Sequence, residues 1–389
     1  MHQTFQRDRF TWLAYLSLAF YAYFLNVLGP ITPFLKEELQ LTYTVSSFHF
    51  TAFAVGILLI GVGGHWVIQR VGRWRSLWLG MIGVSLGALL LVAGRSPVIT
   101  IGASLLMGLV GSLILAIVPA ALSDQHGKFR VIALSEANMI SSVVATAAPL
   151  MVGWFAHLVG GWRLALGIVA LTPILIFVSQ RKGTSSANIS PMEVPIQSSQ
   201  ALPALFWIYW LALVLGVSIE FCMIFWSADY LENVLGMIKA NAAQAVSLFL
   251  AAMILGRITG SRLVQHFSAR ALVTISILIA SIGFLLFWRT EHVFWGLSGL
   301  FLTGLGVANL YPLILSLAIG AAKGNTVQAS SRATLASGTA ILALPLILGR
   351  LADAVGIRSA YGVVVILLIS VFLISQVAGR IPPVVDAHA

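Results

Sequence analysis

Two acidic side chains inside long apolar runs are the residues best suited to chemistry. The chain has 389 residues and twelve acids, and ten of these lie in hydrophilic segments or at the ends of apolar runs. Glu220 lies near the middle of the run from Phe206 to Tyr230, and Glu136 lies inside another run. A charge at the bilayer centre costs about 2.5–3.5 kcal/mol to insert. Such a carboxyl group must therefore face a cavity or a partner, and loss of hydration favours its neutral form.

A carboxyl group that can change its charge near neutral pH can load and unload a proton. We therefore predict proton-coupling roles for Glu220 and Glu136, with Glu220 also a candidate substrate ligand. The structural alternative for Glu220 is a protonated carboxyl group bonded to a neighbouring helix. Arg257 is the basic residue that lies deep in an apolar run. It could pair with Glu136, and we expect it to be a structural gate element rather than a substrate ligand.

Aromatic and amide side chains in two other apolar runs are candidate substrate ligands. Tyr23 and Asn26 share one helical face of the first run, and Asn309 and Tyr311 lie next to Pro312 in a later one. Such side chains could line a cavity for a small organic solute. A proline inside a membrane helix frees a carbonyl that a cavity can use. The tyrosines of the first run, Tyr15 and Tyr23, could equally face lipid or pack against other helices.

Composition places these residues in membrane helices. The chain is 59% hydrophobic and 9% charged, with a mean hydropathy of +0.98, whereas a soluble protein has roughly 25% charged residues. Apolar runs of about 20 residues predict helices that span a bilayer. Twelve are expected, at approximately 11–34, 45–69, 76–94, 98–121, 130–158, 162–180, 204–231, 241–266, 270–288, 293–319, 328–350 and 357–379.

The distribution of basic residues predicts the orientation. An even number of spans puts both termini on one side, and that side has fourteen Lys and Arg residues against seven on the other. The positive-inside rule therefore predicts cytoplasmic termini, in a plasma (inner) membrane. The net charge of +10 then reflects topology and contact with anionic lipid, not nucleic-acid binding. The single cysteine, Cys222, excludes an intrachain disulfide and a cysteine metal cluster.

The chain contains an internal repeat. The segment "PLMVGWFAHLVG" (149–160) matches "PLILGRLADAVG" (345–356), and other matches share the same offset of 196 residues. Parallel repeats of this kind build one large class of secondary transporters, with the substrate near the midplane between the halves. The predicted domains are a six-helix bundle at 1–180, a cytoplasmic linker at 181–203 and a second six-helix bundle at 204–389. Pro149 and Pro345 occupy matched structural positions, and small residues in "GILLIGVGG", "GLVG" and "GLG" predict close helix packing.

With these features the chain resembles the major facilitator superfamily. The segment "GGHWVIQRVGRWRSL" (63–77) looks like that family's cytoplasmic Gly–Asp–Arg–Gly–Arg signature. Arg70, Gly72 and Arg73 match it, while Gln69 stands at the aspartate position and His65 at a glycine position. The resemblance implies gating roles for Gln69, Arg70, Gly72 and Arg73. It also implies an all-α membrane protein, with twelve transmembrane helices in two pseudo-symmetric six-helix halves.

Within that superfamily the second half looks most like the fucose-permease group. The similar pieces are Glu220, Trp226, "GRITGSRL" (256–263), "NLYPLILSL" (309–317) and the run from Pro345 to Asp353. The first half departs from that group, because its first span offers Asn26 and its fourth has no acid. The candidate substrate-binding residues are then Tyr23, Asn26, Glu220, Trp226, Asn309 and Tyr311.

The predicted function is secondary active transport of a small organic solute, sugar-like or another polar metabolite, by alternating access. Protons are the expected coupling ion, with sodium as the alternative, and we expect a monomer without a cofactor or metal. The alternative function is proton-driven efflux of drugs or lipophilic cations. A membrane enzyme is disfavoured because the acids and histidines are scattered. A solute sensor on a transporter fold would be separated by measuring flux.

Overall fold

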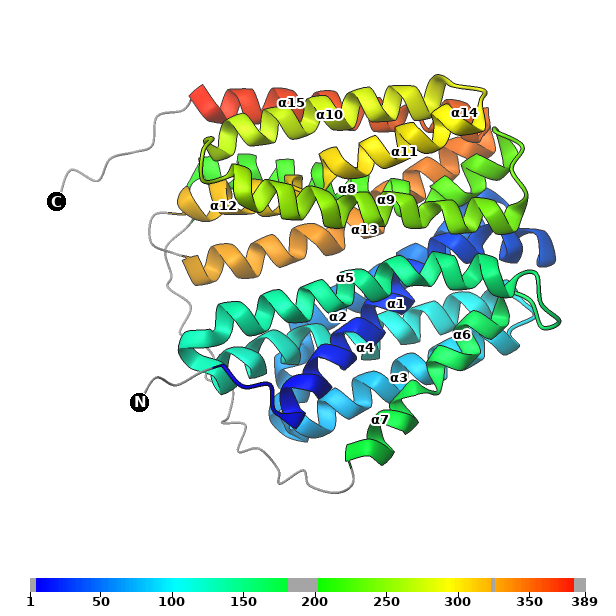
Figure 1. The fold of residues 1–389 in the computed structure, drawn as a ribbon. Helices are drawn as coiled ribbons and strands as arrows, with labels where there is room; N and C mark the ends of the chain where they lie inside the picture. The colour runs from blue at the N-terminus through cyan, green and yellow to red at the C-terminus, as the bar shows by residue number, and fades with distance from the viewer. Residues whose placement is uncertain (1–4, 181–201, 323–325, 381–389) are drawn as a thin grey trace. The chain divides into compact units, whose positions relative to one another are not determined.

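The computed structural model describes residues 5–180, 202–322 and 326–380, and the regular structure within these ranges is helical (Figure 1). Most of the predicted linker, 181–203, lies outside the described residues. Contacts divide the chain into two compact units. The first unit combines the helices before residue 181 with Ile224–Leu250, and the second contains the rest of the described chain.

The first unit is built mainly from the N-terminal helices. They are α1 (Arg9–Glu38), α2 (Tyr43–Val71), α3 (Arg73–Ala93), α4 (Pro97–His126), the 3-10 turn η1 (Gly127–Phe129), α5 (Arg130–Phe155), α6 (Arg163–Ala170) and α7 (Thr172–Gln180). To these the contacts add the end of α8 (Ala204–Asn233) and the first half of α9 (Lys239–Leu263). Helix α1 packs against α5, and α4 packs against α2 and α3.

The second unit contains the beginning of α8, the end of α9 and all the later helices. These are α10 (Ala269–Arg289), α11 (Val293–Val307), α12 (Leu310–Gly320), α13 (Thr326–Val355), α14 (Ile357–Ala360) and α15 (Val363–Arg380). Helix α10 packs against both α11 and α15.

The helices confirm the predicted all-α membrane fold. In the described ranges, ten helical stretches are long and apolar enough to cross a membrane. One of them, Pro97–Phe155, is 59 residues long and contains α4, η1 and α5, which are two of the predicted spans. The sixth predicted span is shorter and interrupted, because α6 ends at Ala170 and α7 begins at Thr172. These elements are consistent with twelve spans.

Glycines allow the closest helix contacts, as their spacing predicted. A Cβ atom on Gly108 of α4 would lie 2.1 Å from the carbonyl oxygen of Phe53 on α2, and one on Gly56 would lie 2.2 Å from the backbone nitrogen of Leu109. In the second unit, a Cβ atom on Gly306 of α11 would lie 2.3 Å from the backbone nitrogen of Ala280 on α10. Backbones approach this closely only where a side chain is absent.

Helices α1 and α8 are the most deeply buried candidate spans. They also contain several of the residues singled out from the sequence, among them Tyr23 and Asn26 on α1 and Glu220 and Trp226 on α8. A helix that is apolar on every side belongs in a protein interior or a membrane. Polar groups on α1 and α8 therefore meet protein neighbours rather than lipid, and the identity of those neighbours decides what each polar group can do.

Candidate functional site

Glu220 lies inside the second unit, beside one basic side chain. Its carboxylate oxygen Oε1 is 4.0 Å from Nη2 of Arg257 on α9. The Glu220 side chain is 16% exposed and that of Arg257 is 45% exposed. The structure therefore gives a nearly buried carboxylate a loose ion pair with a cation that still reaches water. Glu220 can exchange this partner for a proton or a solute at a smaller cost than a tight, fully buried pair would impose.

A break in the tenth predicted span positions two further candidate residues, Asn309 and Tyr311. Helix α11 ends at Val307 and α12 begins at Leu310, so that Asn309 lies at the junction. Pro312 has no N–H and cannot donate to the carbonyl four residues earlier, which helps to interrupt the helix. Discontinuous membrane helices are tolerated where other groups satisfy the freed backbone atoms.

The side chain of Asn309 fastens this break to α9. Its amide nitrogen donates to the carbonyl oxygen of Gly256 over 2.8 Å. The same side chain fills the space above Gly260, where a Cβ atom would lie 2.2 Å from Asn309 Oδ1. The two glycines flank Arg257, so Asn309 helps to fix the segment of α9 that presents the arginine to Glu220.

Tyr311 completes this cluster. Its hydroxyl group is hydrogen-bonded to Ser337 of α13 and interacts electrostatically with Glu220. Tyr311 and Asn309 are both partly buried. The second unit thus brings together four of the residues predicted from the sequence, which we call the Glu220 cluster: Glu220, Arg257, Asn309 and Tyr311.

The other three predicted substrate ligands lie in the first unit and are engaged in packing. Tyr23 is 1% exposed, and its hydroxyl group donates to the carbonyl oxygen of Ala165 over 2.9 Å. Asn26 is 8% exposed, and its amide donates to the carbonyl of Ala22 within the same helix. Trp226 is fully buried, and its ring meets that of Phe50 edge-on at 5.5 Å. These contacts favour the packing role that the sequence left open for the tyrosines.

Glu136 has a different environment from Glu220. Arg7 donates to both of its oxygens, from Nε over 2.8 Å and from Nη2 over 2.6 Å, and the Tyr15 hydroxyl group donates over 3.1 Å. The hydrogen bonds and the charge of Glu136 raise the pKa of Arg7. The side chains of Arg7 and Glu136 are 47% and 27% exposed. Glu136 thus has Arg7 as its partner within the first unit, and its pairing with Arg257, which lies in the second unit, stays a prediction.

The residues of the signature-like segment 63–77 connect α2, α3 and α4 within the first unit. Gly72 has φ +88°, a conformation that favours glycine, and it ends α2 and precedes α3. Arg70 lies over the ring of Trp66 at 3.6 Å, and Nη1 of Arg73 lies 2.5 Å from Asp124 of α4. Gln69 is exposed. Asp124 thus supplies a carboxylate next to a segment that lacks the aspartate of the family signature.

The two matched prolines lie inside continuous helices. Pro149 is buried within α5, and Pro345 is buried within α13. Four residues after Pro149, a Cβ atom on Gly153 would lie 2.4 Å from the carbonyl oxygen of Ala240 at the start of α9. The first proline therefore belongs to a segment that packs closely against another helix of the first unit.

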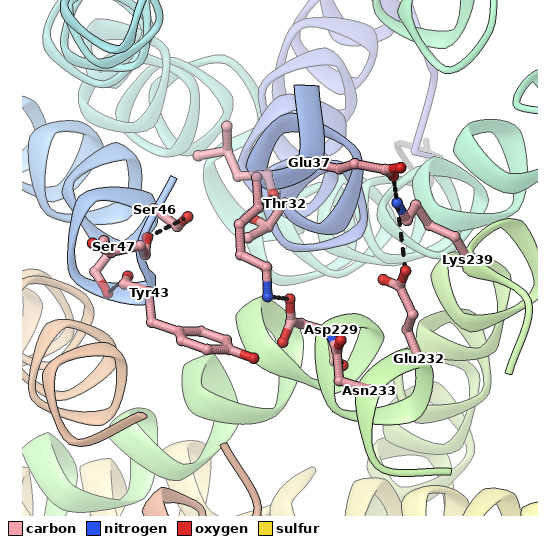
Figure 2. Close-up of polar contacts among 12 residues, drawn as sticks. Thr32, Glu37, Tyr43, Ser46, Ser47, Asp229, Glu232, Asn233 and Lys239 are labelled. Atoms are coloured by element: carbon pink, nitrogen blue, oxygen red, sulfur yellow. Dashed lines mark hydrogen bonds and ion pairs between the residues drawn. The ribbon is translucent and has the colours of Figure 1, made fainter. Parts of the chain in front are cut away.

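Sequence reasoning missed a second charged cluster, because it placed the acids concerned at the ends of spans. Asp229 is 0% exposed and accepts a hydrogen bond from the ammonium group of Lys36 on α1. Lys239 pairs with Glu37 and Glu232 (Figure 2). Helix α8 continues to Asn233, so Asp229 lies one turn inside the helix. The sequence did contain a signal, because acidic residues and lysines lie close together near the ends of the first and seventh predicted spans.

Carboxylates inside membrane helices mark functional sites, among them the pathways of transported solutes and protons. The comparisons with known proteins agree. The family model of the Major Facilitator Superfamily matches residues 14–244, and the chain belongs to this superfamily. Members of this superfamily that the chain matches are transporters rather than enzymes.

Two curated relatives match part of the chain. An uncharacterized MFS-type transporter of Yersinia pestis is 29% identical over 157 residues, which are 39% of this chain and 40% of that protein. The galactose-proton symporter of Escherichia coli (strain K12) is 25% identical over 155 residues, which are 40% of this chain and 33% of that protein. The matched segment spans only about a third to two-fifths of the length of these relatives.

Solved structures match nearly the whole chain. A bacterial homologue of the human lysosomal transporter Spinster, in an inward-facing and occupied conformation, has a TM-score of 0.81 and 16% identity, covering 97% of this chain and 98% of that one. The transporter FucP, in the outward conformation, has a TM-score of 0.59 and 17% identity, covering 95% and 99%. At these identities the likeness establishes the fold alone.

Proposed function

We propose that this protein is a secondary active transporter that moves a small polar organic solute by alternating access, with protons coupled through Glu220. The observation that carries the proposal is the loose ion pair between Glu220 and Arg257, with the carboxylate nearly buried and the arginine half-exposed. A sugar-like solute is supported by the galactose-proton symporter among the relatives.

The Glu220 cluster has the parts that coupled transport needs. The ionised carboxylate is stabilised by Arg257, and the protonated carboxyl group needs no cation in a site of low polarity. Protonation of Glu220 therefore frees Arg257 and turns the carboxylate into a neutral hydrogen-bond donor. A polar solute could then bond to Glu220, Arg257 and the Tyr311 hydroxyl group. The solute and the proton are in this way bound by the same residues.

The proposal also covers the position of the chain in the membrane and its assembly. Both termini lie in the cytoplasm, the chain lies in the plasma (inner) membrane, and the transporter works as a monomer. The basic residues near the expected cytoplasmic ends support that orientation. Glu136, predicted as a second coupling acid, serves in this proposal as the anchor of the N-terminal segment through Arg7.

The test is a transport assay with purified protein in liposomes that contain a pH-sensitive dye. Sugars, amino acids, nucleosides and cationic drugs are added one at a time, under a pH gradient and again under a sodium gradient. We expect one polar solute class to move protons with the wild type and not with Glu220→Gln. Proton movement that is unchanged in Glu220→Gln would remove the coupling role. Solute movement that depends on the sodium gradient alone would rule out coupling to protons.

Efflux of an organic cation is the second candidate. The electrostatic interaction of Tyr311 with Glu220 favours it, since a carboxylate and an aromatic residue in one cluster suit a lipophilic cation. In that case the cationic drugs of the same panel would cross the membrane in one direction while protons move in the other. Sugars would then cause no proton movement.

A further inference from the structure

A pocket of about 320 Å³ lies between helix ends of the second unit and shares no residue with the Glu220 cluster. Residues from the start of α10 and from the ends of α12 and α15 line it, and α10 and α15 lie side by side (Figure 1). Each lining residue is within about two turns of one end of its helix. Because α10 and α15 belong to candidate spans, the pocket lies near one surface of the membrane. Its polar lining consists of Arg270, Thr274, Ser375, Gln376, Gly379 and Arg380.

The lining of the pocket offers donors for an anion. Arg270 and Arg380 are exposed, and no acidic residue is among the described residues that line the pocket. Arginine has five N–H groups in a planar fork that matches the oxygen atoms of a phosphate group. Arg270 donates from Nη1 to the carbonyl oxygen of Gly379 over 2.9 Å, and its other N–H groups stay available to a ligand. The pocket therefore suits a negatively charged group.

The hydroxyl group of Ser375 points to the same kind of ligand. Its oxygen Oγ is buried and has no hydrogen-bond partner among the described residues, although Ser375 lines the pocket. Hydroxyl groups in helices commonly bond to a backbone carbonyl one turn earlier, as Thr274 does with Arg270 over 3.1 Å. A buried polar atom without a partner calls for an explanation. A phosphate oxygen in the pocket would accept a hydrogen bond from this hydroxyl group.

Side-chain bonds between α10 and α15 fix the shape of the pocket. The amide nitrogen of Gln376 donates to Thr274 Oγ1 over 3.0 Å, and Arg270 donates to the backbone at Gly379. These bonds join the two helices at the end where the pocket lies. A site that is formed before binding loses less conformational freedom when its ligand arrives.

The outer surfaces of the same two helices continue from the pocket as apolar stripes. On α15, Leu373 and Ile369 lie one and two turns before Gln376, and both are exposed. On α10, Leu278 lies one turn after Thr274 and is exposed. Residues three or four positions apart share one face of a helix. A polar pocket followed by exposed apolar stripes matches a molecule that has a phosphate head and acyl chains.

We propose that this pocket binds the phosphate group of an anionic phospholipid, whose acyl chains lie along α10 and α15. Arg270 and Arg380 donate to the phosphate oxygens, and Ser375 donates a further hydrogen bond. The described lining has no carboxylate to pair with the ammonium group of a choline or ethanolamine head, so an anionic head is favoured over a zwitterionic one. Basic pockets between membrane helices are suited to such heads.

The test measures lipid binding by the full chain in detergent. Dioleoylphosphatidylglycerol is titrated, and native mass spectrometry gives the dissociation constant of the first bound lipid. Dioleoylphosphatidylcholine has the same chains on a zwitterionic head, and inorganic phosphate has no chains. We expect phosphatidylglycerol to bind at least about tenfold more tightly than phosphatidylcholine. Inorganic phosphate at millimolar concentration should not displace it.

A pair of double variants separates the pocket from the general charge of the membrane surface. Arg270→Gln with Arg380→Gln should weaken the binding of phosphatidylglycerol at least about tenfold, because both charged donors are lost. Arg262→Gln with Arg332→Gln is the matched control, since it removes two exposed arginines of the second unit that do not line the pocket. The control should change binding by less than about twofold, as expected for exposed charges without a specific partner.

The variant Ser375→Ala tests the unpartnered hydroxyl group. It should weaken the binding of phosphatidylglycerol a few-fold, in line with about 0.5–1.5 kcal/mol for one hydrogen bond. In detergent without lipid it should not lower the temperature of thermal unfolding, because Ser375 Oγ has no partner to lose among the described residues. The hydroxyl group would then matter only when the lipid is bound.

Three results would overturn the proposal. Equal losses in the two double variants would mean that the lipid follows surface charge and not this pocket. Equal binding of phosphatidylcholine would remove the preference for an anionic head. Displacement of the lipid by inorganic phosphate would assign the pocket to a free phosphate compound.

The proposal stays testable if the double variant of the pocket fails to fold. Arg380→Gln changes an exposed side chain, and Ser375→Ala removes a hydroxyl group without a partner among the described residues. Both single variants should fold and should bind phosphatidylglycerol more weakly, and unchanged binding in both would overturn the proposal. The assay needs no solute, so its outcome is independent of the transport test of Glu220.

Discussion

Glu220 and Glu136 are both acids inside predicted spans, and the structure holds them in opposite ways. Glu136 is fixed by two bonds of 2.8 Å and 2.6 Å from Arg7 and by a third from Tyr15, and it reaches water. Glu220 is less exposed, and its ion-pair partner lies 4.0 Å away. Bidentate pairs of arginine with a carboxylate are strong and fix geometry. The difference shows that partners, more than depth in the helix, decide whether an acid anchors a segment or changes its charge.

The largest expected effect comes from deforming the surroundings of Glu220. Gly260→Ala places a Cβ atom 2.2 Å from Asn309 Oδ1, and overpacking of this kind costs about 1–3 kcal/mol. We expect a lower temperature of thermal unfolding and little transport. Gly102→Ala is the matched control, because no atom lies within 4 Å of its added Cβ. If both variants unfold alike, Asn309 does not fix this part of α9.

The next effect separates the two arginines. Arg257→Gln should lower proton-coupled transport by about tenfold or more, because it leaves the carboxylate of a nearly buried pair without its cation. Arg7→Gln should leave transport within about twofold, since this ion pair is open to water and lies outside the Glu220 cluster. Initial rates of proton movement in liposomes, normalised to the amount of inserted protein, measure both. A larger loss in Arg7→Gln would reverse the roles given to the two acids.

The smallest effect distinguishes two tyrosine hydroxyl groups. Tyr311→Phe removes a group that bonds to Ser337 near Glu220. We expect a loss of a few-fold in transport, in line with about 0.5–1.5 kcal/mol for one hydrogen bond. Tyr15→Phe removes the weakest of the three bonds to Glu136 and should have no measurable effect on flux. Equal losses in the two variants would mean that proximity to Glu220 does not matter.

Much of the fold could be predicted because apolar length is a strong signal. The long apolar runs of the sequence became helices, and the glycines at 56, 108 and 306 lie where helices meet closely. The site was harder, because hydropathy gives the depth of a residue and not its neighbours. The substrate-binding roles of Glu220, Asn309 and Tyr311 stay predictions, and hydropathy could not reveal that Arg7 reaches Glu136 from 129 positions away.

Asp229 shows most clearly that hydropathy does not predict the neighbours of a side chain. From the sequence it looked like the polar end of a span, yet it is completely buried. Its burial depends on Lys36 and Tyr43, which come from two helices near the start of the chain. No local pattern encodes such a contact. The domain boundary at 181–203 stays a prediction, while the contacts assign Ile224–Leu250 to the unit of the N-terminal helices.

The central claim is that Glu220 couples the solute to protons, and one comparison tests it directly. Once the solute is known, its accumulation driven by a pH gradient and its exchange without a gradient are measured for wild type, Glu220→Gln and Glu136→Gln. We predict that Glu220→Gln loses accumulation, through loss of the proton that its carboxyl group carries, and keeps exchange. Glu136→Gln should keep both. Accumulation that survives in Glu220→Gln, or that disappears in Glu136→Gln alone, would contradict the account.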